Sequence, residues 1–491
     1  MSSFLKKKTV SGVLWRLAVR IGTQAINFIV GIILARLLGP KAYGTVAMLL
    51  IFVNISETLV NCGFNVALVQ KKEVSESDWS SVFYLQCSIS LVLYCCLWFA
   101  SPYIAGFYHM PELANVLRVQ ALILPIHAVQ GIQTATIERD LRFKLTFAIG
   151  MAGTIVGAIV GIGLAYMGFG YWALVYATLL NGFVAMLVAC LFVRRIPRFM
   201  FSMTSLREMF RFGGKMLASD FAGSIMGNIT GIVIGRAYSP QDLACYERGK
   251  QLPNVIMDTF NSPLTTVSFP VLSKLQDDKV RLREGMRQIL MGSTFFIMPA
   301  MAVLSAVSET VIWLLLGDKW LQSVPFCQIA CLSCAFTPFA TVSLQATKAI
   351  GRSGSYLGIT IAKGLVTLFV LALFYRYSVL ALAAAFVLIS TPISMILNSW
   401  TIGKYVNYPI LKQVNDVLPM MAISIALSVI LWSLRFLLPV LSMFTLCIQL
   451  GLGFVLFYCA FLMFRPNALK IVLDGVPVLR KFFPDVVLTC K

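Results

Sequence analysis

Two long apolar runs near the start of the chain, residues 11–38 and 43–69, are joined by the turn Gly39-Pro40. Each run is long enough to cross a bilayer as a helix, which takes about 20 apolar residues. Polar residues recur in both runs every three or four positions, so they fall on one face of a helix. They are Arg16, Arg20, Gln24 and Asn27 in the first run, and Asn54, Glu57, Asn61 and Asn65 in the second. Because a charge at membrane depth costs about 2.5–3.5 kcal/mol unless it faces the bundle interior or water, this pair of runs predicts a water-filled cavity inside a membrane protein.

The same plan recurs between residues 211 and 278, with a basic start, a span, a turn at Ser239-Pro240 and a second polar-striped span. One register without gaps aligns Gly31 with Gly231, Arg36 with Arg236, Pro40 with Pro240, Asn54 with Asn254, and Asn61 with Asn261. A turn proline with identities on both sides indicates two homologous halves. Many transporters are built this way, with the substrate site where the repeats meet.

The whole chain of 491 residues is 59% hydrophobic and only 12% charged, far more apolar than a soluble protein. Its apolar runs predict an all-α polytopic membrane protein of about fourteen transmembrane helices in two homologous lobes. The spans are expected near 13–38, 43–68, 81–104, 113–136, 145–168, 171–193, 212–237, 242–270, 287–315, 323–349, 356–375, 378–402, 416–437 and 441–464.

Lys and Arg residues gather in the N-terminal segment, the even-numbered connections and the tail, whereas the odd-numbered connections hold few. Because basic residues favour the cytoplasmic side of a membrane, both termini are expected to be cytoplasmic. The formal net charge of +20 is therefore interpreted as a topology signal and an attraction to anionic membrane lipids. No nucleic-acid partner is expected.

The longest cytoplasmic connection divides the chain into lobes. We expect an N-lobe of six spans over 1–193, a linker over 194–211, a C-lobe over 212–402, two further spans over 403–464 and a cytoplasmic tail over 465–491. Prolines break the tail into pieces too short to span a bilayer, so it either lies on the inner membrane face or is disordered.

Basic residues at span positions are candidates for binding an anionic substrate; they are Arg16, Arg20, Arg118, Arg248, Lys250 and Lys363. Guanidinium groups bind phosphate oxygens in pairs and an ammonium acts as a point charge, so a diphosphate headgroup fits this set. Simpler roles compete, since Arg16 lies close enough to the interface to extend to it, and Lys363 suits either role equally. Arg248 and Lys250 lie two positions apart and cannot share one helical face. We expect Arg248 in the cavity and Lys250 near lipid headgroups or a carboxylate.

Uncharged polar residues on the same faces are expected to line the cavity; they are Gln24, Asn27, Asn54, Asn61, Tyr246, Gln251 and Asn254. Three carboxylates, those of Glu57, Asp220 and Asp258, belong to the same stripes. We interpret them first as salt-bridge partners of the basic residues. The second interpretation is that they are protonatable groups that couple transport to an ion gradient.

No metal site and no cofactor are expected. The 12 cysteines lie almost entirely in apolar runs, and both His109 and His127 are isolated in the sequence. Cys327, Cys331 and Cys334 have helical spacing, but no neighbouring His or carboxylate completes a zinc site. We see no phosphate-binding glycine loop and no extramembrane stretch long enough for a catalytic domain, so the chain is not expected to be an enzyme.

Several stretches carry a more specific signal: Trp15, Leu34–Gly44, Gly63–Lys72, Ala105–Tyr108, Glu138–Lys144, Arg211–Gly213, Val267–Asp278 and Leu316–Trp320. In these stretches the chain resembles the bacterial polysaccharide transporters of the oligosaccharide flippase family. This family shares a superfamily with the multidrug extruders and the lipid II flippases. The match is dense from residue 1 to about residue 350. One departure is Tyr238-Ser239-Pro240, where relatives usually have a Leu-Gly turn, and it puts a family-like hinge of the second lobe in doubt.

The resemblance implies a two-lobed, multidrug-extruder-like bundle that alternates between inward-open and outward-open states. It implies a cargo of undecaprenyl-diphosphate-linked oligosaccharide, moved across the bacterial inner membrane for O-antigen, capsule or exopolysaccharide synthesis. Cationic cavity residues would bind the diphosphate. Polysaccharide polymerase and assembly proteins are candidate partners, and a monomer is expected.

Two alternatives stay open. A cation-coupled multidrug exporter of the same superfamily would want an acidic, aromatic cavity, and the basic residues here count against it. A membrane glycan polymerase or ligase would need a large periplasmic loop, which the spacing of the spans does not provide.

Overall fold

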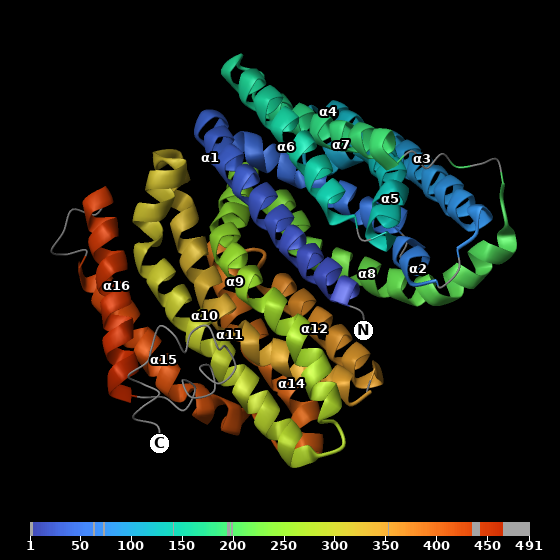
Figure 1. The fold of residues 1–491 in the computed structure, drawn as a ribbon. Coiled ribbons are helices and arrows are strands. Elements are labelled where there is room, and N and C mark those ends of the chain that lie inside the picture. Colours follow the sequence, from blue (N-terminus) through green and yellow to red (C-terminus); the bar gives the residue numbers. More distant parts are fainter. Residues whose placement is uncertain are drawn as a thin grey trace. The chain divides into compact units, whose positions relative to one another are not determined.

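The structure is a computed structural model that describes the backbone of residues 3–61, 64–71, 74–140, 142–193, 197, 200–351, 353–434 and 442–464. In these ranges every regular element is a helix (Figure 1). Nine of the described helices are long and apolar enough to cross a membrane, and two shorter apolar helices cover Gly358–Phe374 and Met443–Tyr458. Helices occupy each of the predicted spans, so the all-α polytopic fold class is confirmed.

The chain forms two compact units, Met1–Ala244 and Cys245–Lys491. The first holds α1 (Ser3–Asn61), α2 (Phe64–Gln70), α3 (Glu76–Phe107), α4 (Leu113–Gln120), α5 (Ile123–Arg139), α6 (Phe143–Tyr166), α7 (Tyr171–Val193) and α8 (Met203–Ala237). The second holds most of α9 (Pro240–Lys274), then α10 (Lys279–Leu316), η1 (Asp318–Ser323), α11 (Val324–Ala349), α12 (Ser353–Phe374), α13 (Val379–Ala385), η2 (Phe386–Ser390), α14 (Thr391–Val406), α15 (Ile410–Ser433) and α16 (Met443–Phe464).

The predicted division into lobes at 194–211 stays a prediction. In the structure α8 begins at Met203, inside that linker, and it packs against α1, α2 and α3 of the first unit. The predicted tail over 465–491 lies outside the described residues.

Two predicted spans are interrupted by an irregular turn. The span over 113–136 divides into α4 and α5, and the span over 378–402 contains the π-helical turn η2 between α13 and α14. In each case a proline stands four residues after an affected carbonyl, Pro125 after Ala121 and Pro392 after Leu388. Proline lacks the N–H that would bond this carbonyl, and its ring clashes with it, so the helix must widen or break there.

The turn between the first two spans is the one that the sequence predicts. α1 bends at Gly39, whose φ of 73° lies in the region that glycine adopts without strain. A few residues later Gly44 is buried, and a Cβ atom added to it would overlap the backbone carbonyl of Pro240. Pro40 and Pro240 are the aligned prolines of the repeat, so the turn regions of the two repeats pack against each other.

Replacing Gly44 by alanine should therefore destabilise the protein by about 1–3 kcal/mol, the usual cost of overpacking a rigid contact. The matched control is Gly163→Ala in α6, where nothing lies within 4 Å of the added Cβ. Thermal unfolding of both variants in detergent, with membrane abundance as a second readout, measures the effect. Equal melting temperatures would contradict the predicted contact.

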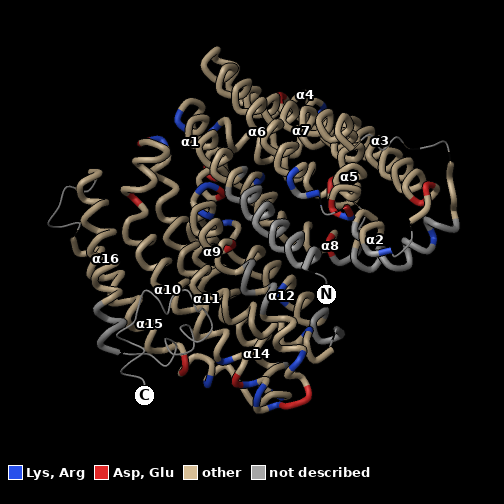
Figure 2. The backbone as a smooth tube through the Cα atoms, viewed as in Figure 1, with Lys and Arg blue, Asp and Glu red and all other residues tan. Residues whose placement is uncertain are grey.

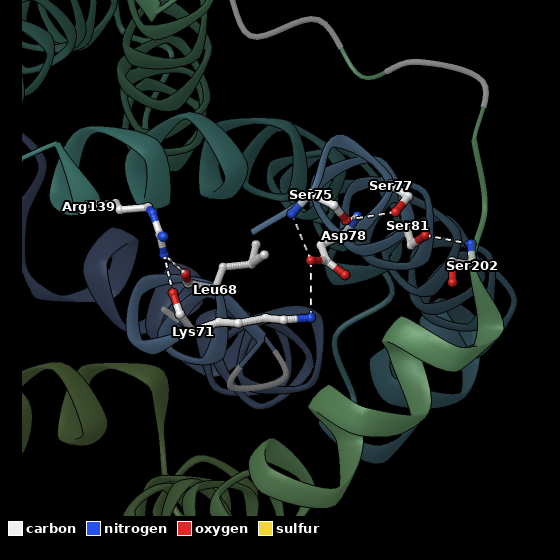
Figure 3. Close-up of polar contacts among 8 residues, drawn as sticks. All are labelled: Leu68, Lys71, Ser75, Ser77, Asp78, Ser81, Arg139 and Ser202. Atoms are coloured by element: carbon white, nitrogen blue, oxygen red, sulfur yellow. Dashed lines mark hydrogen bonds and ion pairs between the residues drawn. The ribbon is translucent and has the colours of Figure 1, made fainter. Parts of the chain in front are cut away.

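Charged side chains lie mainly towards helix ends. Figure 2 shows long uncharged stretches through α3, α6, α7 and α16, as membrane-spanning helices require. At one end of the first unit, Arg139 donates hydrogen bonds to the carbonyl oxygens of Leu68 and Lys71, at 2.8 and 2.6 Å (Figure 3). The ammonium of Lys71 lies 3.1 Å from the carboxylate of Asp78. Two of the motifs that carry the family resemblance, Gly63–Lys72 and Glu138–Lys144, are therefore in contact in one polar cluster, on the side predicted to be cytoplasmic.

Asp78 also holds the start of α3. Its carboxylate accepts a hydrogen bond from the Ser75 amide at 2.9 Å, and its own amide donates to the Ser75 hydroxyl, forming a capping box. Nearby, the amide of Ser202 donates to the Ser81 hydroxyl at 2.8 Å (Figure 3). This bond ties the segment before α8 to the first turns of α3.

Asp78→Ala should lower the free energy of unfolding by about 1–3 kcal/mol, because it removes a helix cap and leaves the Lys71 ammonium without this carboxylate. Asp78 is only 2% exposed. The control is Asp140→Asn at an exposed position of the same unit, which should unfold like the wild type. Denaturant titration of the purified proteins provides the measurement.

A comparable polar cluster closes one end of the second unit. Arg287 Nε lies 3.0 Å from Asp416 Oδ1, and the Tyr408 hydroxyl donates to Asp416 Oδ2 at 2.7 Å. Burial and the hydrogen bond to Asp416 raise the pKa of Tyr408, so this phenol stays a neutral donor at physiological pH. The cluster joins α10 to the start of α15, beside an apolar core that includes Phe339, Ile402 and Val417.

Candidate functional site

A titratable pair lies inside the first unit, between α1 and α5. The Glu57 Oε1 atom lies 2.5 Å from the His127 Nδ1 atom, and the two side chains are 29% and 30% exposed. Glu57 thus meets an imidazole rather than one of the predicted cations. Of the two histidines that look isolated in the sequence, one is therefore brought to a carboxylate by the fold.

His127 also lines a cavity of about 440 Å³ between α1, α5, α6 and α7. Its polar lining comes from Asn27, His127, Gln130, Thr154, Thr178 and Asn181. α6 and α7 approach closely here because Gly153 and Gly157 face the backbone of α7. Asn27, a predicted cavity residue, therefore lines a polar pocket of the first unit, together with polar residues that the sequence did not single out.

Other predicted cavity residues of the first unit lie on its surface. Gln24, Asn54, Asn61 and Asp220 are all exposed. Asn54 and Asn61 accept hydrogen bonds through their main-chain oxygens, such as the 3.0 Å bond that the Thr58 hydroxyl donates to the Asn54 carbonyl. The side chains of Arg16 and Arg20 lie outside the described residues.

Arg118 has protein partners on α3. Its Nε donates to the Ser101 hydroxyl at 2.8 Å, and its guanidinium lies 4.9 Å from the centre of the Trp98 ring. A cation over an indole face is stabilised by about 0.5–2 kcal/mol. Part of the Arg118 guanidinium is therefore already engaged by side chains of its own unit.

The second unit gathers four predicted site residues at the start of α9. Arg248 donates to Gln251 Oε1 at 2.5 Å and lies 5.9 Å from the ring centre of the buried Trp320 in η1. Lys250 forms a 2.9 Å ion pair with Glu247 and lies 4.0 Å from the ring centre of Tyr246. The two cations thus have different surroundings, as expected from their spacing, and Lys250 has a carboxylate partner.

α9 approaches η1 closely because Gly249 leaves no side chain between them. A Cβ atom at this position would lie 2.6 Å from Phe326 Cβ and 2.8 Å from the Ser323 carbonyl oxygen. Tyr246 packs edge-on against Phe326. Arg248 is therefore fixed beside the connection that carries the motif Leu316–Trp320, which lies on the side predicted to be non-cytoplasmic.

Further along α9, Asn254 and Asp258 are exposed. The Cys334 Sγ atom lies 3.6 Å from Asn254 Oδ1. Cys327, Cys331 and Cys334 are buried, and in the part of the chain that the structure describes no group of His, Cys, Asp and Glu fits a metal ion.

Lys363 lies in a pocket of about 330 Å³ formed by α11, α12, η2 and α14. It is ten residues from the start of α12 and eleven from its end, so at about 1.5 Å per residue its Cα atom is roughly 15 Å from either end of the helix. A lysine side chain is too short to reach either end of α12, and Lys363 is among the residues that line the pocket. Of the two roles that the sequence left open, this favours cavity lining, which stays a prediction.

Sequence reasoning missed His127, Asn181 and the hydroxyl residues around Lys363. Serine and threonine are common in apolar helices and give no period that separates cavity lining from packing. His127 is the only histidine in its span, and its partner Glu57 is 70 residues away in the chain. A search of every span for polar residues that share one helical face, and not for charges alone, would have found Asn181.

Breaking the Glu57–His127 contact should destabilise the first unit. We expect Glu57→Gln and His127→Phe each to cost about 1 kcal/mol, and the double variant to cost less than the sum, because the second change removes a group that the first left unpartnered. Thermal unfolding of the four proteins of this cycle tests the coupling. Glu138→Gln, at an exposed position of α5, serves as the control, and strictly additive effects would show that the pair is not coupled.

The described helices, the polar residues embedded in them and the two compact units define a multi-pass membrane protein with a transporter fold. The fold is similar to that of the lipid II flippase MurJ in an inward closed conformation, with a TM-score of 0.72 at 15% identity over 92% of this chain and 99% of that chain. An inward-facing multidrug resistance MATE family transporter matches with a TM-score of 0.58 at 16% identity, over 80% of this chain and 98% of that chain. The predicted multidrug-extruder-like fold is confirmed.

A family model described as polysaccharide biosynthesis protein matches residues 33–325. The chain belongs to this family of polysaccharide biosynthesis proteins. It is 24% identical over 414 residues to the succinoglycan biosynthesis transport protein ExoT of Rhizobium meliloti (strain 1021), covering 84% of each chain. It is also 24% identical over 336 residues to the lipopolysaccharide biosynthesis protein WzxC of Escherichia coli (strain K12), covering 67% of each chain.

Proposed function

We propose that this protein is a flippase that moves an undecaprenyl-diphosphate-linked oligosaccharide across the bacterial inner membrane for surface polysaccharide synthesis. Family membership and the flippase-like fold support this function, as do relatives named for succinoglycan transport and lipopolysaccharide biosynthesis. The protein performs no covalent chemistry on its cargo. It works by alternating access between the two sides of the membrane.

The observation that carries the proposal is the exposure of polar side chains within spans of both units. Gln24, Asn27 and Asn54 in α1, and Asn254 and Asp258 in α9, are exposed although the helices around them are apolar. Such residues are costly against lipid tails, so the faces that carry them face water. A wet, polar path is what the hydrophilic part of an oligosaccharide needs to cross the bilayer.

The cationic residues supply the contacts to the anionic headgroup. Arg20 and Arg248 are the proposed diphosphate contacts, since guanidinium binds phosphate oxygens in pairs. Arg16, Arg118 and Lys250 complete the proposed headgroup set, of which Arg118 and Lys250 also have the protein partners described above. Lys363 is proposed as a further substrate-binding cation, in the second unit. Tyr246 and Gln251 position the two cations of α9.

Glu57 is the proposed group for coupling to an ion gradient. Its contact with His127 gives it a partner whose protonation would change the charge of the pair. Asp220 and Asp258, which are exposed, are further coupling candidates. We propose that the protein works as a monomer with both termini in the cytoplasm. Polymerase or assembly proteins of the polysaccharide pathway are proposed partners.

The test is complementation of surface polysaccharide in a host that lacks its own flippase. Wild type should restore the polymer, and both Arg20→Ala and Arg248→Ala should lower it roughly tenfold or more at matched membrane abundance, because each loses charge-assisted bonds to the headgroup. Arg281→Ala is the control, since the Arg281 side chain is 77% exposed. Full activity of both cavity variants would overturn the assignment of these arginines.

Two other outcomes separate the competing functions. Failure of the wild type to restore polymer, together with export of cationic drugs in an efflux assay, would favour a multidrug exporter, which the MATE-like fold accommodates. Polymer elongation or ligation by the purified protein would favour a glycan polymerase or ligase. Proteoliposomes that flip a fluorescent undecaprenyl-diphosphate oligosaccharide would support the proposed function directly.

A further inference from the structure

We propose that the pocket around Lys363 recognises the carboxylate of an acidic sugar residue in the oligosaccharide, separately from the diphosphate. The proposal rests on the flippase function above and adds a specificity site to it. The pocket lies wholly within the second unit. Its lining residues come from α11, α12, η2 and α14, which pack side by side (Figure 1).

The first argument is the unused charge of Lys363. No Asp or Glu is among the residues that line the pocket. Within the described part of the chain, no ion pair or hydrogen bond of the Lys363 ammonium is found, whereas Lys71 and Lys250 each have a carboxylate within 3.1 Å. An ammonium in mid-span without a counter-ion favours an anionic ligand that is brought in from outside.

The second argument is the set of hydroxyl residues that line the same pocket as Lys363: Ser333, Thr337, Thr367, Ser390, Thr391 and Ser394. The Thr337, Thr367 and Thr391 hydroxyls donate to carbonyl oxygens of their own helices, at 3.4, 3.0 and 3.4 Å. Their lone pairs stay available to accept hydrogen bonds. Ser390 Oγ is buried and has no partner among the described residues. The pocket therefore offers both donors and acceptors, as a ring of sugar hydroxyls requires.

The third argument is the irregular backbone at this place. Ser390 is the last residue of the π-helical turn η2, and Thr391 follows it. Single π-helical turns within α-helices are rare and are frequently found at functional sites. Phe386 of this turn and Phe336 of α11 both line the pocket. The two rings supply apolar surface for the carbon-bound hydrogens of a sugar.

Charge and size distinguish the carboxylate of one sugar from the diphosphate. Lys363 is the one cation among the described residues that line the pocket. One cation matches one negative charge, whereas a diphosphate carries more charge and is bound best by paired guanidinium donors. The volume of about 330 Å³ is at the low end of the range of roughly 300–1,000 Å³ for small-ligand pockets. It suits one sugar ring and not a whole oligosaccharide.

Binding to the full-length protein in nanodiscs tests the proposal. Saturation-transfer difference NMR would compare methyl glucuronide, methyl glucoside and inorganic pyrophosphate. We expect the glucuronide signal to exceed the glucoside signal, and Lys363→Met to weaken glucuronide binding at least about tenfold, because it removes a charge-assisted hydrogen bond. Lys363→Arg should retain binding, and Ser390→Ala should weaken both sugars. The control is Lys412→Met, at an exposed lysine of the same unit.

The second arm uses transport in proteoliposomes, with lipid-linked oligosaccharides that carry or lack a uronic acid. Lys363→Met should slow the acidic cargo and leave the neutral cargo unchanged. Equal loss of both cargoes would show a structural role, and no loss would show an idle lysine; either result overturns the proposal. Displacement of the glucuronide by pyrophosphate through Lys363 would also overturn it, in favour of a diphosphate site. If wild type flips neither cargo, the proposed flippase function itself fails.

Discussion

The cost of a polar group in hydrocarbon is the constraint on which the rest of this structure depends. It forces the backbone into helices, because only a helix satisfies its own N–H and C=O groups within one span. It also sorts the side chains. Some charged residues stabilise the fold as ion pairs, such as Lys71–Asp78 and Arg287–Asp416. Charged residues within the spans need a partner, a cavity or water.

The described in-span ionisable groups meet this requirement in different ways. Glu57 and His127 partner each other, and Arg118 lies against an indole ring and a hydroxyl. Lys250 has both a carboxylate and a phenol beside it. Lys363 lines a pocket whose described lining residues are hydroxyl-bearing, aromatic or aliphatic and include no Asp or Glu. This difference is why the same residue type supports a structural role at one position and a ligand-binding role at another.

Backbone contacts decide how closely the helices approach, and small residues make them possible. Gly44 meets Pro240 at the contact between the two repeat turns, and Gly249 lets α9 reach η1. Proline acts at the opposite extreme. Pro392 lacks a backbone N–H, and the π-helical turn that helps to line the Lys363 pocket lies just before it in the chain. Residues without catalytic chemistry thus determine where the polar side chains can point.

The sequence by itself determined the helical class, the number and order of the spans, the Gly39-Pro40 turn and the family, because apolar run length and turn chemistry are local properties. The sequence also singled out Asn27, Arg248 and Lys363 as polar residues whose transfer into the lipid core would cost free energy. Only the tertiary structure decided their surroundings. Three features depend on which helices pack together: the contact of Glu57 with His127, the placement of Arg248 beside Trp320, and the hydroxyl residues that share a pocket with Lys363. That packing is set by contacts between residues far apart in the chain, and no local pattern encodes them.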